Sequence, residues 1–220
     1  MEQLLAGRLA EDLKIDVTQV VREYWEVLFL KSLLESSHGK NLVFKGGTAL
    51  RLVYGSPRFS EDLDFALLKD SLKGETESIA QSMAEPYPEA SVTDAAEKRW
   101  TYLWEIKVTE GYLPHPFRIK IEISRRPVKD YDFQLRLITS PTTPLQVLGN
   151  VATLEQLYKD KQECLEGRTA PKDVFDIWYV CQKLRMPYQP PVTNISKQIL
   201  KRDLGKYLPA DYRPVIEELL

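Results

Sequence analysis

Apolar residues near the start of the chain recur at the spacing of an α-helix. Asp16 precedes them and can accept a hydrogen bond from a free backbone N–H of the first turn, while Gly39 lets the chain leave the helix. The pattern predicts a long helix over residues 16–37 that packs in the core. The side chains of its apolar stripe are Val20, Tyr24, Val27, Leu28 and Leu34.

A short strand, a turn and a second helix are predicted next. Residues 41–44 are mostly apolar and favour a strand, and Gly46 and Gly47 indicate a tight turn. Thr48 then begins a short helix that ends near Gly55. The sequence thus predicts a strand, turn and helix in direct succession.

Strict alternation of apolar and polar residues follows. Because successive side chains of a strand point to opposite faces, Asp62 and Asp64 project to the same side. Ala66 shares that side. The opposite face carries Leu63, Phe65 and Leu67.

The middle of the chain predicts more of the sheet. Residues 71–84 favour a helix, whereas residues 103–109 and 118–124 alternate and predict an antiparallel pair of strands. These elements predict an α+β (mixed α/β) fold, with a small mixed β-sheet flanked by helices.

The last third of the chain is predicted to be helical. Pro141 and Pro144 indicate a linker, so we expect an N-terminal core over residues 1–143 and a C-terminal helical region over residues 144–220. A proline-containing loop is expected over residues 186–193. The expected helices cover residues 154–166, 172–184, 195–204 and 212–220.

Composition restricts the class of protein. The 220 residues are 43% hydrophobic, which is enough for a substantial core, and the net charge of −2 requires that any nucleic-acid contact be local. Cys164 and Cys181 form no CxxC pair and are expected to be reduced core residues. The chain starts without a signal-peptide pattern and has no apolar run of membrane-spanning length, so we expect a cytoplasmic protein.

The two aspartates of the alternating segment are the first candidates for chemistry. Carboxylates two residues apart on one strand face repel each other unless a cation lies between them. Mg²⁺ prefers one or two carboxylates together with phosphate oxygens and water. Asp62 and Asp64 therefore predict a magnesium site for a triphosphate, although exposed aspartates on a solvated strand are the simpler explanation of the motif alone.

Glu122 is the candidate for a third carboxylate. It lies on the polar face of the strand predicted over residues 118–124, with Lys120 and Ser124. Such a group can bind a metal ion or accept the proton of an attacking hydroxyl. The alternative is a solvated strand glutamate.

The glycine turn and the C-terminal helices add candidate nucleotide contacts. Gly46 and Gly47 let backbone N–H groups approach an anion at a helix N-terminus, although an ordinary turn is the alternative. Lys161 shares the apolar stripe of its predicted helix and needs an anion, either a triphosphate or a buried carboxylate, unless it extends along the helix edge. Asp173 and Asp176 lie on one side of the next helix, where they can orient Lys161 or stabilise the helix dipole.

Several arginines and lysines are further candidates. Arg51, Arg58 and Arg168 are candidate phosphate ligands. A local basic surface is also needed for any RNA contact. The residues that we select for it are Arg125, Arg126, Lys197, Lys201 and Arg202.

Two segments resemble a known family. The segment KGGTALRLVYGSPRFSEDLDF, which begins at Lys45, and the segment YKDKQECLEGRTAPKDVFDIWYV, which begins at Tyr158, occur in the order found in the AbiEii/AbiGii toxin family. That family belongs to the DNA polymerase β-like nucleotidyltransferase superfamily. The resemblance implies a small mixed sheet that bears a metal site and a helical region that closes over the nucleotide.

The resemblance also implies roles for individual residues. It assigns nucleotide contacts to Lys45, Gly46, Gly47, Thr48 and Ser60. It assigns metal ligation to Asp62 and Asp64, with Glu122 as a less defined third acid. It assigns nucleotide or acceptor contacts to Lys161, Asp173 and Asp176.

The implied function is a magnesium-dependent nucleotidyltransferase that transfers a nucleoside monophosphate from an NTP to an acceptor hydroxyl. Some family toxins modify the 3′ end of tRNA, so tRNA and a cognate antitoxin are the expected partners. Two alternatives stay open. The acceptor can be a protein hydroxyl, as in AMPylation, or the chain can be a nucleotide-binding module without turnover.

Overall fold

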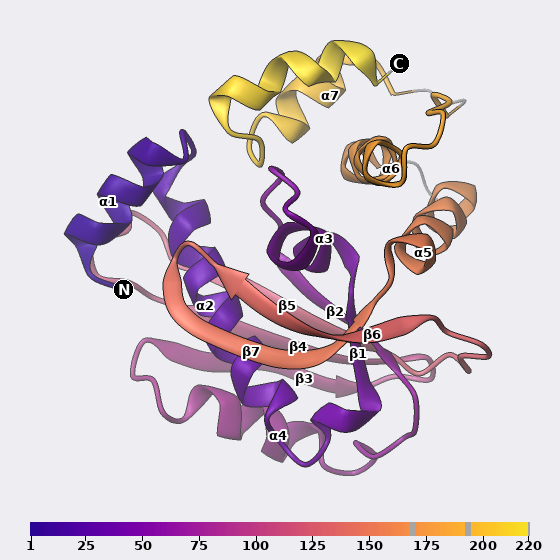
Figure 1. Ribbon diagram of the computed structural model, residues 1–220. Helices are drawn as coiled ribbons and strands as arrows, with labels where there is room; N and C mark the ends of the chain where they lie inside the picture. Colours follow the sequence, from indigo (N-terminus) through magenta and orange to yellow (C-terminus); the bar gives the residue numbers. More distant parts are fainter. Residues whose placement is uncertain (168–169, 192–194, 220) are drawn as a thin grey trace.

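A seven-stranded mixed sheet forms the centre of the computed structural model, which describes residues 1–167, 170–191 and 195–219 (Figure 1). The strands are β1 (Leu42–Lys45), β2 (Asp62–Leu67), β3 (Ala90–Glu97), β4 (Thr101–Val108), β5 (Phe117–Ser124), β6 (Phe133–Ser140) and β7 (Thr143–Ala152). The helices are α1 (Gln3–Asp12), α2 (Val17–Leu34), α3 (Gly46–Tyr54), α4 (Thr76–Ala84), α5 (Leu154–Gly167), α6 (Pro171–Leu184) and α7 (Lys197–Leu204), with short 3₁₀ segments at Gly39–Asn41 and Ala210–Glu218.

The order of strands across the sheet is β3-β4-β5-β2-β1-β7-β6. β1 is antiparallel to β2 and parallel to β7, and β2 is parallel to β5. The remaining neighbours, β3 with β4, β4 with β5 and β6 with β7, are antiparallel. The strand that carries both aspartates is therefore central, with partners on each side.

Helix α2 covers one face of this sheet. Its apolar stripe joins Phe44, Leu63 and Phe65 in the largest hydrophobic cluster, in which these side chains are fully buried. Burial of each side chain of this size contributes roughly 1.5–3 kcal/mol. Asp16 caps the helix as expected, since its side chain accepts a hydrogen bond from the backbone N–H of Thr18 at 2.8 Å.

The other face of the sheet carries the aspartates and contacts the C-terminal helices. Val43 and Ala66 pack there with Leu157 of α5 and Val180 of α6. A separate cluster joins α6 to α7 and the last 3₁₀ segment. In Figure 1 these helices lie at one side of the sheet, beyond α3. The expected mixed α/β fold is thereby confirmed.

Some expected elements differ from the structure. The segment from Pro141 to Pro144 is no linker: it forms the turn between β6 and β7 and the first residues of β7, which pairs with β1 in the central sheet. Prolines are as common in tight turns as in linkers, which explains the error. The expected helix over residues 71–84 begins only at Thr76.

Three strands, β3, β6 and β7, were not anticipated, and α3 begins at Gly46 rather than at Thr48. The expected proline loop extends past residue 191, where residues 192–193 lie outside the described part of the chain. Within the described ranges, no helix is long and apolar enough to cross a bilayer.

Candidate active site

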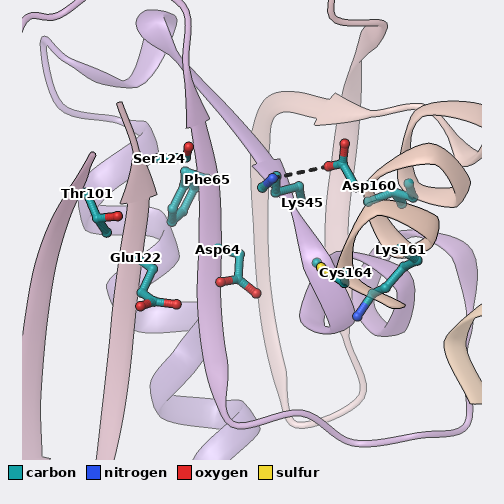
Figure 2. Close-up of a pocket in the computed structure, with 11 residues that line it drawn as sticks. Lys45, Asp64, Phe65, Thr101, Glu122, Ser124, Asp160, Lys161 and Cys164 are labelled. Atoms are coloured by element: carbon teal, nitrogen blue, oxygen red, sulfur yellow. Dashed lines mark hydrogen bonds and ion pairs between the residues drawn. The ribbon is translucent and has the colours of Figure 1, made fainter. Parts of the chain in front are cut away.

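Three carboxylates lie side by side on the face of the sheet that contacts the C-terminal helices. Asp64 of β2 is the register partner of Glu122 on β5, and Asp62 precedes it by two residues on the same face. Figure 2 shows Asp64 and Glu122 on neighbouring strands with their carboxylates directed toward the same space. The structure thus brings together the three acids that the sequence analysis selected.

The surroundings of Asp64 disfavour its charged form. The pKa of Asp64 is raised to about 6: burial is the largest cause, the charges of Asp62 and Glu122 add to it, and those of Lys161 and Lys45 act in the opposite direction. Repulsion among carboxylates is therefore built into this face of the sheet, and a divalent cation bound there relieves it.

Gly46 is required by the position of Asp64. Its φ angle is +78°, a left-handed conformation that other residues adopt at a cost. A Cβ atom at this position would lie 2.3 Å from Oδ2 of Asp64. The N-terminus of α3 therefore lies against the carboxylate with no room for a side chain between them.

Gly47 makes room for a second buried group. A Cβ atom here would lie 2.2 Å from Nη2 of Arg58 and 2.9 Å from Oγ of Ser60. Thr48 is buried, and its hydroxyl donates a hydrogen bond to the backbone carbonyl of Asp62. Ser60 thus lies beside the glycines, whereas Thr48 holds the start of β2.

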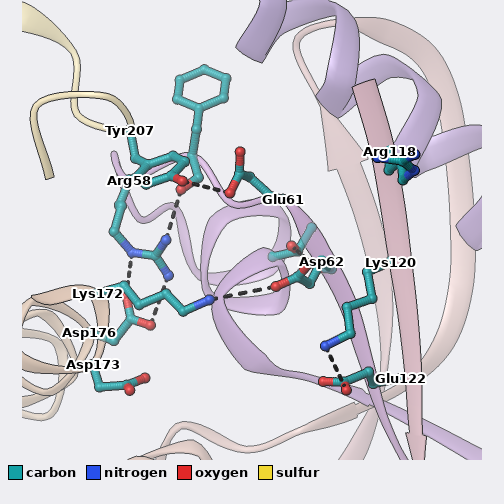
Figure 3. A network of polar contacts seen from close by, with 12 residues as sticks. Arg58, Glu61, Asp62, Arg118, Lys120, Glu122, Lys172, Asp173, Asp176 and Tyr207 are labelled. Carbon is teal, nitrogen blue, oxygen red and sulfur yellow. Dashed lines mark hydrogen bonds and ion pairs between the residues drawn. The ribbon is translucent and has the colours of Figure 1, made fainter. Parts of the chain in front are cut away.

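Lys161 of α5 belongs to a buried ionic cluster. Its ammonium group lies 2.9 Å from Oδ1 of Asp173 and 2.7 Å from Oδ2 of Asp176. Arg58 makes a bidentate contact with Asp176, at 2.7 Å from Nε and 2.8 Å from Nη2 (Figure 3). Of the partners that the sequence left open for Lys161, the structure provides buried carboxylates.

The cluster is electrostatically satisfied. Burial alone raises the pKa of Asp176, but the charges of Arg58 and Lys161 outweigh it and lower that pKa to about 2. For Lys161, burial alone would lower the pKa. The charges of Asp176 and Asp173 outweigh burial, so the pKa of Lys161 is raised. Lys161 is held as a cation at the edge of the site.

The other candidate arginines have different surroundings. Arg51 donates to Glu23 at 2.7 Å and its guanidinium lies 3.7 Å from the ring centre of Phe59, so it serves the packing of α3 against α2. Arg58 is 2% exposed and fully used by its contacts in the cluster. Arg168 lies outside the described residues.

The structure adds residues that the sequence analysis missed. Asp160 accepts hydrogen bonds from Lys45 at 3.2 Å and from the hydroxyl of Tyr131 at 2.5 Å. Lys172 lies 3.5 Å from Asp62. In the sequence, Asp160 precedes Lys161 and Lys172 precedes Asp173. This position next to selected residues is the feature from which the sequence analysis could have identified them.

A cavity of about 220 Å³ unites these groups. It is lined by residues of β1, β2, β4, β5, α5 and the start of α3, among them Lys45, Gly46, Asp64, Glu122 and Lys161. In the described ranges, no group of three His, Cys, Asp or Glu side chains is arranged to hold a metal ion by itself. The donors present still fit Mg²⁺, because this ion is usually held by one or two carboxylates and completed by substrate phosphates and water.

Comparisons with known proteins agree with this geometry. A family model described as the nucleotidyl transferase AbiEii toxin of Type IV toxin–antitoxin systems matches residues 28–219, which make up most of the chain. A search of curated protein sequences gives no match.

Two solved structures share the fold. JHP933 from Helicobacter pylori has a TM-score of 0.60 and 21% sequence identity, with 93% of this chain and 90% of that chain covered. MenT4, a nucleotidyltransferase toxin from Mycobacterium tuberculosis H37Rv, has a TM-score of 0.63 and 16% identity, with 100% and 88% covered. At these identities the likeness establishes the fold alone.

Proposed function

The chain belongs to the AbiEii nucleotidyl transferase toxin family, and on this basis we propose that it transfers a nucleoside monophosphate from a magnesium-bound NTP to the 3′ hydroxyl of tRNA. It is a nucleotidyltransferase of a toxin family, and a Type IV toxin–antitoxin system implies a cognate antitoxin. The tRNA acceptor follows from the resemblance described above. Such an acceptor places the reaction in the cytoplasm.

One observation carries the proposal. The carboxylates of Asp64 and Glu122, the N-terminus of α3 at Gly46 and the side chain of Lys161 line one cavity, and Asp62 lies on the same face of the sheet, two residues before Asp64. The positive end of a helix and a lysine favour a phosphate, whereas the carboxylates favour a divalent cation. A nucleoside triphosphate with its metal ion satisfies both at once.

The residues of the chain have distinct tasks in this reaction. Asp62 and Asp64 would hold Mg²⁺, with Glu122 beside them; the bound ion would neutralise the phosphates and polarise the α-phosphorus. Backbone N–H groups at Gly46 and Gly47 contact phosphate oxygens. Lys161, which lines the cavity and is held by Asp173 and Asp176, is placed to contact the departing pyrophosphate.

The proton balance requires a base. The acceptor oxygen forms a bond to the α-phosphorus, the bond to pyrophosphate breaks, and the hydroxyl proton leaves. Glu122 lies on the strand next to Asp64 and is half-exposed to the cavity, so its carboxylate is placed to take this proton. Its contact with Lys120, at 2.8 Å, orients it.

Incubation of the protein with total tRNA, Mg²⁺ and each α-labelled NTP in turn tests the proposal. A variant that carries both Asp62→Ala and Asp64→Ala is the control. We expect labelled tRNA with the wild type alone, and the NTP that labels it identifies the base. Label on protein instead would show a protein acceptor, and NTP binding without pyrophosphate release would show a binding module.

A further inference from the structure

A basic surface adjoins the cavity at one corner of the sheet. It combines the turn between β3 and β4 with the loop that follows β5. The backbone N–H of Arg125 donates to the carbonyl of Trp100 at 2.9 Å, and its side chain donates to the carbonyl of Lys98 at 2.8 Å. These bonds hold the two segments together. Five exposed residues make up this surface, which we call the basic rim: Lys98, Arg99, Trp100, Arg126 and Lys129.

The cations of the rim are available to an external anion. Lys98, Arg99, Arg126 and Lys129 are exposed, and in the described part of the chain none of them makes an ion pair. Arg125, in contrast, contacts Asp70 at 3.2 Å and Glu97 at 3.0 Å.

The other basic residues selected from the sequence are also paired. Lys197 and Lys201 contact Glu217, and Arg202 contacts Asp203. Among the five that the sequence selected for an RNA contact, Arg126 alone has no ion pair within the described ranges. The structure thus moves the candidate surface from α7 to the rim.

Trp100 gives the rim an apolar platform. Its side chain is 45% exposed, and the guanidinium of Arg99 lies 5.0 Å from the centre of its ring. A large aromatic group costs free energy when it is left in water. An exposed ring beside unpaired cations is the arrangement on which unpaired bases stack in single-stranded nucleic-acid sites.

A groove of about 590 Å³ connects the rim to the cavity. Arg126 and Lys129 line the groove, and Lys45, Thr101 and Ser124 line both the groove and the cavity. Figure 2 shows Thr101 and Ser124 on neighbouring strands at the cavity. From Glu122 to Arg126 the chain advances by four residues, a distance of roughly 13 Å at most.

We propose that the basic rim binds the single-stranded 3′ end of the RNA acceptor. Backbone phosphates contact Arg126 and Lys129, one base stacks on Trp100, and the terminal hydroxyl enters the cavity through the groove. Single-stranded RNA fits better than a duplex, since only unpaired bases can stack on a side chain. This inference rests on the proposed nucleotidyl transfer to RNA and adds the surface that selects the acceptor.

Binding and turnover of an RNA hairpin with a short single-stranded 3′ extension test the inference. Fluorescence anisotropy measures affinity at several salt concentrations without any need for catalysis. Trp100→Ala should weaken binding by on the order of tenfold, because stacking of a base on an aromatic side chain has this magnitude. Arg126→Gln combined with Lys129→Gln should lower the slope of log affinity against log salt by about 1.4, or about 0.7 for each lost phosphate contact.

Matched controls separate the rim from general effects. Tyr212→Ala removes an aromatic ring that is 46% exposed elsewhere. Arg8→Gln with Arg185→Gln removes two exposed charges that have no ion pair in the described ranges. Both controls should leave RNA affinity unchanged, and a blunt hairpin should bind more weakly than the extended one.

The outcomes are distinct. In turnover, the rim variants should raise the KM for RNA and leave the KM for the NTP unchanged. A raised KM for the NTP alone would assign the groove to the nucleotide and overturn the inference, as would RNA affinity equal to that of the wild type. If the wild type binds the extended RNA through the rim but never labels it, the proposed reaction fails while the binding surface stands.

Discussion

Replacement of Gly46 by alanine should disable the site through a steric effect that can be separated from backbone strain. The new Cβ would lie 2.3 Å from Oδ2 of Asp64, whereas an ordinary contact begins at about 3.4 Å. The carboxylate must therefore retreat by roughly 1 Å. A misplacement of this size in an active site can reduce the rate about 100-fold.

Gly55 provides the matched control. Its φ angle is +76°, close to the +78° of Gly46, so alanine meets the same left-handed strain at both positions. The nearest atom to a Cβ at Gly55 is the hydroxyl of Tyr179, at an unstrained 3.7 Å. Each variant should lose about 1–2 kcal/mol through the backbone, which corresponds to a Tm lower by about 2–8 °C for a chain of this size.

Thermal unfolding and steady-state nucleotidyl transfer together decide the matter. Both variants should unfold at comparable temperatures, while only Gly46→Ala should lose kcat by on the order of 100-fold. Wild-type activity in both variants would refute the reasoning, because Asp64 would then tolerate a displaced position. An equal loss in both would attribute the effect to α3 rather than to the carboxylate.

Three further variants test the electrostatics of the site. Asp64→Asn should abolish transfer. The pKa of Asp64 in the folded protein is raised to about 6, so the stability of the wild type without metal falls as the pH rises from about 4 to about 6. The Tm of the variant should therefore exceed that of the wild type above about pH 6 but not below about pH 4. A Tm difference that is constant with pH would contradict this assignment. Arg58→Met should lower stability by roughly 3–5 kcal/mol in chemical denaturation, since it leaves Asp176 with one cation fewer in a buried cluster; a loss below about 1 kcal/mol would show that Lys161 alone suffices. Lys172→Met should change stability by less than about 1 kcal/mol, because the lysine side chain is 41% exposed. If Lys172 reaches the phosphates, the variant should raise the KM for the NTP. An unchanged KM would restrict Lys172 to its contact with Asp62.

The sequence predicts the elements of the site better than the sheet around them. The cap at Asp16 and the alternation at Asp62 and Asp64 depend on local chemistry, which a single segment contains. The proximity of Glu122 to Asp64 depends on the order of strands, which no local pattern encodes. The sequence shows that Glu122 lies on the polar face of its strand, which suggests that it could lie near Asp64. Only the parallel pairing of β2 with β5 establishes that it does.

β6 shows that alternation does not fix which face is buried. Its apolar residues Leu135 and Leu137 alternate with Gln134 and Arg136 as in a strand, yet they are exposed, at 64% and 50%, so the apolar face does not point toward the core. β6 lies at the edge of the sheet, and only one of its sides has a partner strand. Tertiary position overrides local pattern at such an edge.

The two segments that resemble the toxin family are joined by side-chain contacts, and this changes the meaning of the glycine pair. From the sequence, Gly46 and Gly47 are expected either to approach a phosphate or to form an ordinary turn. In the structure the absence of a side chain at Gly47 admits Arg58, which holds Asp176, which in turn holds Lys161 of the second segment. The glycine pair therefore makes room for the ionic cluster as well as for the proposed phosphate contact, so the N-terminus of α3 and Lys161 are held in a fixed relation. A chain that kept the phosphate loop but lost Arg58 would keep its nucleotide contacts and lose the alignment of Lys161.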